Sequence, residues 1–454
     1  MNGIAELLAN LGYEVTGSDA KRSEVTDRLE SLGVRLWIGH EPAHVGAADV
    51  VVVSSAIPAS NPEVVEARRR AVPVIPRAEM LAELMRLRYG IAIAGAHGKT
   101  TTTSMVALVL EHAGLDPTAV IGGRLSAFGS NARLGRGEYM VVEADESDRS
   151  FLKLSPSIAV ITNIDREHME SYGSWENLQQ AFADFANKVP FYGAVIACAD
   201  DGPVRELLPV LTRRVITYAL SERQADVVAR DMRLEAFGST SVVLHRGADG
   251  VTTELGAMRL RVPGRHNLMN ALAAVAVGIE AGVPFARTAE ALAEFRGAER
   301  RFQMRGEEQG VMVVDDYGHH PTEIAAVIAA ARAGIDRRVV VVFQPHRYSR
   351  TSLLMHEFGG ALGAADEVVL TDIYPAGEAP IPGVTIEALA DAVRASAACP
   401  VHVVKSLEAL PAAVVALSRG GDLVVTLGAG SIGTVGDRIL DEIRARGAAA
   451  RDRG

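Results

Sequence analysis

The chain has 454 residues, of which 48% are hydrophobic and 22% charged; this length predicts about three domains, and the composition excludes a disordered or fibrous protein. The 46 Lys and Arg residues are outnumbered by 56 Asp and Glu, and the formal charge of -10 argues against generic binding to nucleic acid or to anionic membranes. Two cysteines cannot form a disulfide framework, and the sequence contains neither a membrane-length apolar run nor a signal-type leader, so we expect a cytosolic protein.

Short β-branched runs alternate with Ala- and Leu-rich stretches, which predicts an α/β fold with parallel sheets. At the N-terminus we expect a helix at 3–11 and a strand from Tyr13 to Ser18 that closes on Asp19. Further strands are predicted at 50–53, 91–94, 140–143, 158–162, 311–314, 339–343, 367–371 and 423–427, and helices at 78–88, 101–113 and 322–333. Breaks near 86–90 and 296–300 predict domains of residues 1–88, 89–297 and 298–454.

The strongest local motif is IAIAGAHGKTTTT at residues 91–103, where an apolar strand leads through a Gly-rich turn into a helix. Glycines let backbone N–H groups surround phosphate oxygens, while Lys99 supplies a cation and Thr100 a hydroxyl for Mg²⁺. The spacing differs from a standard Walker A motif, because Ile93 stands where the first Gly is expected. The alternative is a plain turn with a surface lysine, and the strand before and helix after the turn argue against it.

The next two predicted strands end in groups that suit a metal bound to a nucleotide. Four acids occupy residues 143–148, and Glu143 is the best candidate ligand because it directly ends the apolar run; a solvated acidic loop is the alternative. His168 follows the strand at 158–162, where a lone histidine is usually a packed or capping residue. Since three strand ends bring Lys99, Glu143 and His168 to one sheet edge, we favour metal ligation.

In the C-terminal third, DDYGHHP at 315–321 and QPHRYSRT at 344–351 each end a strand before a helix, which predicts a second ligand-binding edge. Arg347 and Arg350 are spaced i, i+3 and are expected on one helical face, as binding of a carboxylate requires; surface decoration is the alternative. GAGSIG at 428–433 matches the dinucleotide fingerprint, but no second strand with an acid follows, so we interpret it as a tight turn near the active site.

Together these motifs resemble those of the Mur ligase family over essentially the whole chain. The resemblance rests on GAHGKTTTT (95–103), EADESD (143–148), TNIDREHME (162–170), RHNLMNALAA (265–274), RRFQ (300–303), DDYGHHPTEI (315–324) and HRYSRT (346–351). It implies a Rossmann-like N-terminal domain for a UDP-sugar, a central P-loop ATPase domain and a C-terminal Rossmann-like domain for the amino acid.

The resemblance also implies roles for individual residues. Lys99 and Thr100 are expected to hold the ATP phosphates and a first Mg²⁺, with Glu143 as the carboxylate ligand of that ion and His168 as a ligand of a second Mg²⁺. Further ATP contacts are expected from Gly95, His97, Gly98, Thr101, His266, Asn267, Asn270, Arg301 and Asp316. The residues expected to bind L-alanine are Tyr317, His319, Arg347 and Arg350.

The implied reaction belongs to peptidoglycan precursor synthesis. The lactyl carboxylate of UDP-N-acetylmuramate attacks the γ-phosphorus of ATP, and the amine of L-alanine then attacks the acyl phosphate, with ADP and phosphate as products. One alternative is a ligase that recycles a tripeptide onto the same sugar nucleotide, but such enzymes typically carry Tyr at the position of Ser147. Folate polyglutamate and cyanophycin synthetases lack the two C-terminal motifs, and the intact metal ligands argue against a non-catalytic nucleotide-binding protein. The oligomeric state stays open.

The N-terminal domain is expected to lack its first strand and its UDP-cradling loop. In a Rossmann unit, the acid matched here by Asp19 lies about 20 residues after the Gly-rich loop, so that loop would fall at or before Met1. We interpret this as a mis-assigned start codon, with a true truncation as the alternative.

Overall fold

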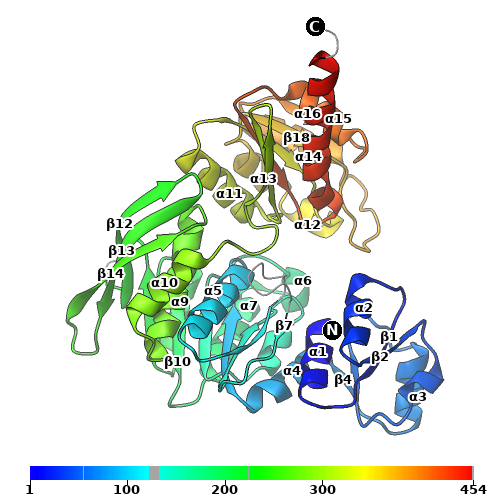
Figure 1. Ribbon diagram of the computed structural model, residues 1–454, viewed down its shortest axis with the longest axis vertical. Helices are drawn as coiled ribbons and strands as arrows, with labels where there is room; N and C mark the ends of the chain where they lie inside the picture. Colours follow the sequence, from blue (N-terminus) through cyan, green and yellow to red (C-terminus); the bar gives the residue numbers. More distant parts are fainter. Residues whose placement is uncertain (55, 122–131, 223, 452–454) are drawn as a thin grey trace. The chain divides into compact units, whose positions relative to one another are not determined.

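The computed structural model describes residues 1–54, 56–121, 132–222 and 224–451, and it confirms the predicted α/β class (Figure 1). The chain divides into two compact units. The first unit contains Met1–Arg230, Val242–Met258 and Met269–Phe295. The second contains Asp231–Ser241, Arg259–Leu268 and Arg296–Gly454.

Residues 1–88 contain two small parallel sheets of two strands each. β1 (Thr16–Asp19) pairs with β2 (Arg35–Ile38), and β3 (Val51–Val53) pairs with β4 (Val74–Pro76). The helices are α1 (Asn2–Asn10), α2 (Glu24–Ser31), α3 (Pro62–Arg69) and α4 (Arg77–Arg86), with a 3₁₀ turn η1 (Pro42–Val45). The helix expected at 3–11 is confirmed as α1, whereas the strand expected from Tyr13 begins three residues later, at Thr16.

A ten-stranded sheet, ordered β14-β13-β12-β11-β10-β9-β5-β8-β6-β7, forms the middle of the chain. Its parallel strands are β5 (Tyr89–Ala94), β6 (Thr118–Val120), β8 (Tyr139–Glu143), β9 (Ile158–Ile161), β10 (Ala194–Cys198) and β11 (Val215–Ala219). β7 (Ala132–Arg133) runs antiparallel to β6. Alternate residues of β5 are buried on both faces of the sheet, as parallel strands covered by helices require. The strands predicted at 91–94, 140–143 and 158–162 are confirmed.

The other end of this sheet was not predicted. β12 (Val227–Glu235), β13 (Gly238–Arg246) and β14 (Thr252–Leu260) are nine residues long each. β12 is parallel to β11, but β12 and β14 carry charged residues at exposed positions and β13 begins with Gly and Ser. None of them therefore shows the continuous apolar run that marks the other parallel strands. The helices of this region are α5 (Lys99–His112), α6 (Met169–Tyr172), α7 (Trp175–Asn187), α8 (Gly202–Leu207), α9 (Arg265–Glu280) and α10 (Phe285–Glu294), with 3₁₀ turns η2 (Ser150–Lys153) and η3 (Leu208–Val210).

The second unit is built on a six-stranded sheet, ordered β15-β16-β20-β17-β18-β19. β15 (Gln303–Glu308) is antiparallel to β16 (Val311–Asp316). The parallel strands β17 (Arg338–Phe343), β18 (Glu367–Leu370), β19 (Val401–Val403) and β20 (Asp422–Leu427) continue the sheet. All four strands predicted here from 311 to 427 are confirmed.

Helices cover both faces of this sheet (Figure 1). One face packs against α11 (Pro321–Gly334), α13 (Met355–Leu362) and α14 (Ile386–Ser396), and the other against α15 (Leu410–Leu417) and α16 (Val435–Arg451). The short helix α12 (Tyr348–Leu353) follows β17, and the 3₁₀ turn η4 (Ser431–Thr434) follows β20. The segments after β16, β17 and β20 therefore meet at the carboxyl edge of the sheet, where ligands bind in such folds.

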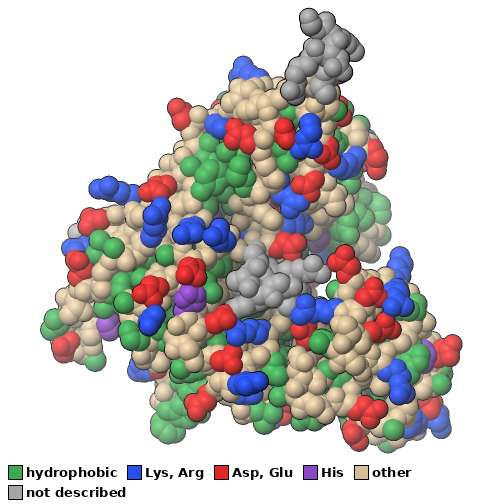
Figure 2. All heavy atoms as spheres, in the orientation of Figure 1, with side chains coloured by type: hydrophobic (Ala, Val, Ile, Leu, Met, Phe, Trp, Pro, Cys, Tyr) green, Lys and Arg blue, Asp and Glu red, His purple; other side chains and the backbone are tan. Residues whose placement is uncertain are grey.

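On the face shown in Figure 2, acidic and basic side chains are interspersed over the surface. Among the residues that the structure describes, no helix combines the length and apolar character needed to cross a bilayer.

Candidate active site

The turn Gly95–Gly98 connects β5 to the N-terminus of α5, and its two glycines are required by the geometry. Gly95 has a φ of 141°, and a Cβ there would overlap the hydroxyl of Thr162. Gly98 has a φ of 79°, and a Cβ there would lie 2.6 Å from Oδ1 of Asn270. The turn thus presents backbone N–H groups and a helix N-terminus without side chains in the way, which suits binding of phosphate.

Residues that follow β9 hold this turn in place. The backbone N–H of His97 donates to Oδ1 of Asn163 at 2.8 Å, and the amide of Asn163 donates to the carbonyl of His97 at 2.9 Å. The hydroxyl of Thr162 donates to the same carbonyl at 2.7 Å, and the His97 ring lies 2.9 Å from Asp165. The TNID segment therefore sets the shape of the turn before any nucleotide binds.

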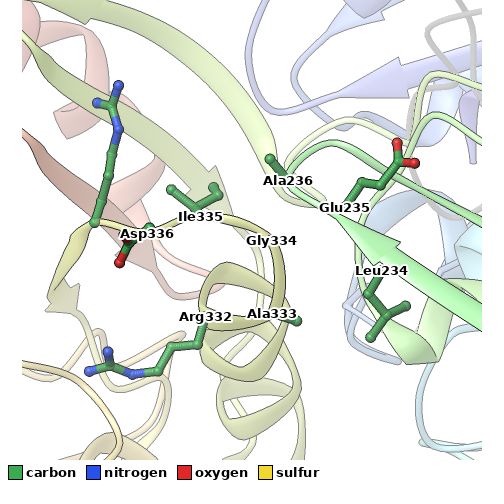
Figure 3. A pocket seen from close by; sticks show the side chains of 9 residues that line it. Leu234, Glu235, Ala236, Arg332, Ala333, Gly334, Ile335 and Asp336 are labelled. Carbon is green, nitrogen blue, oxygen red and sulfur yellow. The ribbon is translucent and has the colours of Figure 1, made fainter.

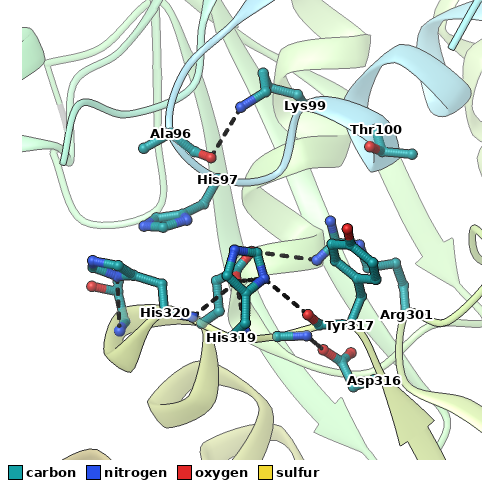
Figure 4. A network of polar contacts seen from close by, with 12 residues as sticks. Ala96, His97, Lys99, Thr100, Arg301, Asp316, Tyr317, His319 and His320 are labelled. Carbon is teal, nitrogen blue, oxygen red and sulfur yellow. Dashed lines mark hydrogen bonds and ion pairs between the residues drawn. The ribbon is translucent and has the colours of Figure 1, made fainter. Parts of the chain in front are cut away.

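Lys99 is folded back onto the turn (Figure 4). Its ammonium donates to the carbonyls of Gly95 at 2.6 Å and Ala96 at 3.1 Å, and to Oε1 of Glu146 at 2.9 Å. Burial lowers the pKa of Lys99, but the charges of Glu146 and Glu143 outweigh this effect and the net pKa is raised. Burial raises the pKa of Glu146 to about 7, although Lys99 acts in the opposite direction. Lys99 therefore stays charged beside a buried carboxyl group.

Thr100 and Glu143 meet at the carboxyl edge of the central sheet. The Thr100 hydroxyl lies 3.0 Å and 3.1 Å from the two carboxylate oxygens of Glu143. Thr101, the next residue of α5, is buried. The structure thus brings together the hydroxyl and carboxylate that the sequence predicted as a pair, and both are hard oxygen donors of the kind that Mg²⁺ prefers.

His168 lies in a cluster that the sequence analysis did not identify. One ligand atom each from Glu146, Glu167 and His168 lies within 4.8 Å of the others, and both glutamates are buried. Within the described part of the chain, the second oxygen of Glu146, Oε2, is buried and has no hydrogen-bond donor. Glu146 and Glu167 sit inside the EADESD and TNIDREHME motifs, but nothing in those strings distinguishes them from neighbouring acids. Their role becomes visible only through burial.

The predicted nucleotide-binding residues of the second unit lie near the start of α9 and the end of β16. Burial lowers the pKa of His266 to about 4, and the charge of Arg301 acts in the same direction. Asn267 donates to the carbonyl of Pro263 at 2.7 Å. Asp316 accepts hydrogen bonds from two backbone N–H groups, those of Phe302 and Gly318, each at 2.7 Å. Arg301 lies 3.4 Å from Glu323 of α11.

The predicted amino-acid residues gather at the carboxyl edge of the six-stranded sheet. The rings of Tyr317 and His319 meet edge to face at 5.5 Å, and the His319 ring donates to the carbonyl of Tyr317 at 3.1 Å (Figure 4). His319 lies 5.6 Å from the ring of His346, which stacks on Tyr374 at 5.5 Å. His346 and Tyr374 were missed because sequence spacing does not show which rings meet.

One sequence prediction here is wrong in detail. Arg347 and Arg350 do not share a helical face, because Arg347 is the N-cap of α12 with a φ of 72°, outside the helix. Arg350 lies inside α12, and its guanidinium donates to Nδ1 of His346 at 3.2 Å. Burial lowers the pKa of His346 to about 4, with the charges of His319 and Arg350 adding to the effect. His346 is therefore a neutral ring that accepts from an arginine.

A pocket of about 590 Å³ in the second unit involves none of the predicted site residues (Figure 3). It is lined by the β12–β13 turn and by the end of α11. Its two arginines are paired, Arg332 with Asp366 at 2.9 Å and Arg337 with Glu307 at 2.8 Å. Both arginines of the pocket are therefore already bound to carboxylates.

Comparisons with known proteins agree with the motifs. Three family models match successive parts of the chain: "Mur ligase family, catalytic domain" at residues 1–89, "Mur ligase middle domain" at 93–278 and "Mur ligase, glutamate ligase domain" at 300–430. They confirm the predicted three-domain α/β architecture.

Curated relatives and solved structures extend this likeness to the full chain. The UDP-N-acetylmuramate–L-alanine ligase of Geobacter sp. (strain M21) is 54% identical over 446 residues, covering 98% of this chain and 95% of the relative. The protein of that name from Anaeromyxobacter sp. (strain Fw109-5) is 55% identical over 445 residues, covering 98% and 96%. The crystal structure of the UDP-N-acetylmuramate–alanine ligase of Thermotoga maritima has a TM-score of 0.79 at 29% identity and covers 98% of this chain and 97% of that one. From its motifs, its fold and these matches, the chain belongs to the Mur ligase family.

Proposed function

We propose that the protein is an ATP-dependent ligase that joins L-alanine to the lactyl carboxylate of UDP-N-acetylmuramate through an acyl phosphate. The observation that carries this proposal is the set of Lys99, Thr100 and Glu143 at one sheet edge, in a chain more than half identical to relatives that bear this activity as their name. ATP supplies the phosphoryl group, and ADP and phosphate are the other products.

The first step places an anionic nucleophile against a polyanion, so positive charge must offset their repulsion. Lys99 supplies such a charge, and its three donors are already directed at Gly95, Ala96 and Glu146. To reach a phosphate oxygen, the ammonium exchanges at least one of these acceptors for the nucleotide. The Gly95–Gly98 turn adds backbone N–H groups whose positions are fixed in advance by Asn163.

Magnesium fits the donors present. Thr100 and Glu143 would hold one ion, and His168 a second, with Glu146 and Glu167 beside it. A divalent cation would also satisfy the buried oxygen of Glu146 that has no donor among the described residues. When bound, Mg²⁺ supplies Lewis-acid polarisation of the phosphoryl group and neutralises its developing charge.

In the second step, the amine of L-alanine attacks the acyl carbon, and phosphate leaves. Arg350 and Arg347 would bind the alanine carboxylate, which keeps the amine free to attack. His346 is neutral and accepts from Arg350, so the arginine is oriented without losing its charge. The rings of Tyr317 and His319 would border the small side chain of the amino acid.

The remaining assignments follow the same scheme. Residues 1–88 would bind the UDP-sugar, residues 89–297 would bind ATP through the residues placed above together with Asn270, and residues 298–454 would bind the amino acid. Because the proposed reaction consumes ATP, the protein would act in the cytoplasm.

The test is phosphate release by the purified protein with ATP, Mg²⁺ and UDP-N-acetylmuramate, with each amino acid added in turn. We expect release that depends on both the sugar nucleotide and L-alanine, and a product whose mass equals the sum of the two minus water. Release that requires the tripeptide in place of alanine would assign the protein to peptide recycling. Nucleotide binding without any release would contradict the proposal.

A further inference from the structure

The Gly428–Gly433 turn matched a dinucleotide fingerprint in the sequence, and the proposed function gives it no role. Its glycines serve close packing within the second unit. A Cβ at Gly430 would lie 2.7 Å from the ring of Tyr374, and a Cβ at Gly433 would overlap the guanidinium of Arg300. The turn is therefore shaped to let an arginine and an aromatic ring approach its backbone.

Arg300 is held in a single orientation by this turn and by β16. Its Nε donates to Oδ2 of Asp315 at 2.8 Å, and its Nη2 donates to the carbonyl of Gly428 at 2.7 Å. Asp315 is almost fully buried, with a side chain 1% exposed, and its other oxygen accepts from the Thr426 hydroxyl at 2.7 Å. Because a guanidinium is planar, two such bonds fix its plane as well as its position.

Arg300 also holds Tyr317. The carbonyl of Arg300 accepts the backbone N–H of Tyr317 at 2.7 Å, and its guanidinium lies 5.3 Å from the centre of the Tyr317 ring. The guanidinium of Arg301 lies at the same distance from that ring. Cation–π contacts at this range attract the ring and limit its rotation. Tyr317 is 36% exposed, so these contacts and not burial keep it in place.

The contacts close into a ring around the amino-acid site. From Tyr317 they pass through His319 and His346 to Tyr374, with centroid distances of 5.5, 5.6 and 5.5 Å. Tyr374 packs against the Gly428–Gly433 turn, and a carbonyl of that turn accepts a hydrogen bond from Arg300. Arg300 in turn contacts the ring of Tyr317, which closes the ring of contacts. In this ring of contacts, Arg300 joins the Gly428–Gly433 turn to Tyr317.

We propose that Arg300 is a positioning residue for the amino-acid site. By keeping Tyr317 at a fixed distance from the Gly428–Gly433 turn, it sets the space available to the side chain of the incoming amino acid. This inference rests on the proposed function, since it assumes that the ring of contacts borders the amino acid. It also gives the glycine turn a purpose other than nucleotide binding.

The test compares the parent protein with Arg300→Ala, Arg300→Lys and a control, Arg337→Ala. Arg337 also binds a carboxylate, that of Glu307, and backbone carbonyls, those of Gly310 and Asp422, but it lies just before β17, at the amino ends of the parallel strands. We expect Arg300→Ala to raise the KM for L-alanine at least ~10-fold and to narrow the preference for alanine over valine, since small displacements of positioning groups have effects of this size or larger. The KM for ATP should change less than twofold.

The alanine KM of Arg300→Lys should lie between those of the parent and Arg300→Ala, because lysine keeps the charge but cannot form the planar pair of bonds. The inference is overturned if the alanine KM is unchanged in Arg300→Ala. It is also overturned if the KM values for alanine and ATP rise together, as they would if the whole second unit were destabilised. Arg337→Ala should resemble the parent in both.

A second measurement does not depend on turnover. In protein with labelled histidines, the NMR signals of His319 and His346 should shift in Arg300→Ala and stay in place in Arg337→Ala. Equal spectra for the two variants would overturn the inference. If the parent protein shows no alanine-dependent turnover but the signals shift as expected, the proposed function fails and the role of Arg300 in an amino-acid site fails with it, while its structural effect on the ring of contacts stands.

Discussion

The phosphate turn of the first unit and the aromatic ring of contacts in the second unit both lie at the carboxyl ends of parallel strands, yet they are held differently. Lys99 bonds to two carbonyls within four residues of itself and to one buried carboxyl group. Tyr317, His346 and Tyr374 come from separate loops; their side chains meet through ring contacts by way of His319, and the segments of His346 and Tyr374 are also joined by a β-bridge. In the first arrangement a single ammonium group, that of Lys99, supplies the positive charge. In the second, the position of each side chain depends on several weak contacts. Single substitutions should therefore act more severely in the first.

The largest effect is expected for Lys99→Ala. Turnover should fall at least ~10²-fold, the scale for losing one electrostatic contact to a transition state. Because this change also leaves Glu146 buried without its cation, the double variant Lys99→Ala/Glu146→Gln should be measured beside it. Lys153→Ala, which breaks an exposed ion pair with Glu79, is the control. Near-parental turnover in Lys99→Ala or in the double variant would remove Lys99 from the phosphate site.

Glu143→Gln tests the metal ligand next to the lysine. The amide keeps an acceptor for the Thr100 hydroxyl but loses the charge, so the Mg²⁺ concentration for half-maximal rate should rise roughly 10-fold or more. The matched control is Glu138→Gln, an exposed residue just before the same strand. Identical magnesium curves for the two variants would show that Glu143 is not a ligand.

Arg350→Ala tests the other region. Loss of a charge-assisted hydrogen bond of ~1.5–3 kcal/mol corresponds to roughly a 10- to 100-fold rise in the KM for L-alanine. The KM for ATP should stay within twofold, since Arg350 lies in the domain without the phosphate turn. Arg394→Ala, an exposed arginine of α14, should leave both constants unchanged. An unaltered alanine KM in Arg350→Ala would break the contrast between the two regions.

The last effect concerns the stability of the protein as a function of pH and leaves the turnover rate aside. The pKa of His266 is lowered to about 4, so the unfolded chain binds more protons than the folded one between that pH and 6.5. The free energy of unfolding should therefore fall as the pH decreases from 6.5 towards 4. Relative to the parent, His266→Gln should remove on the order of 3 kcal/mol of that decline. His356→Gln, at an exposed position, should follow the parent curve.

The same contrast explains what could be predicted from the sequence. The phosphate turn is one continuous string, so Lys99 and Thr100 could be assigned from residues 91–103 alone. Glu143 followed because parallel strands end at a common edge. The roles of Glu146 and Arg300 could not be predicted, because each depends on a partner 47 or 128 residues away, Lys99 in one case and Gly428 in the other.

The fold divides along similar lines. Buried parallel strands such as 339–343 can be recognised by consecutive β-branched residues, and they were predicted with small errors at their ends. The long strands β12 and β14 carry charged residues at exposed positions, and β13 begins with Gly and Ser, so none of the three shows the continuous apolar run of a buried parallel strand. Arg347 was placed in a helix because spacing was considered without backbone conformation, and its positive φ is a property of the loop before α12.

The two small sheets of residues 1–88 have a consequence for the dynamics of the protein. In the described part of the chain, β1 pairs with β2 and β3 with β4, so each strand has one edge without a strand partner, whereas β5 has β8 and β9 on its two sides. Amide hydrogens of these small sheets should exchange with solvent through local opening, well before those of β5. A sugar nucleotide that binds this region would slow that exchange, because binding to the closed form shifts the opening equilibrium. Hydrogen exchange would then report the affinity for the sugar nucleotide without any chemical step.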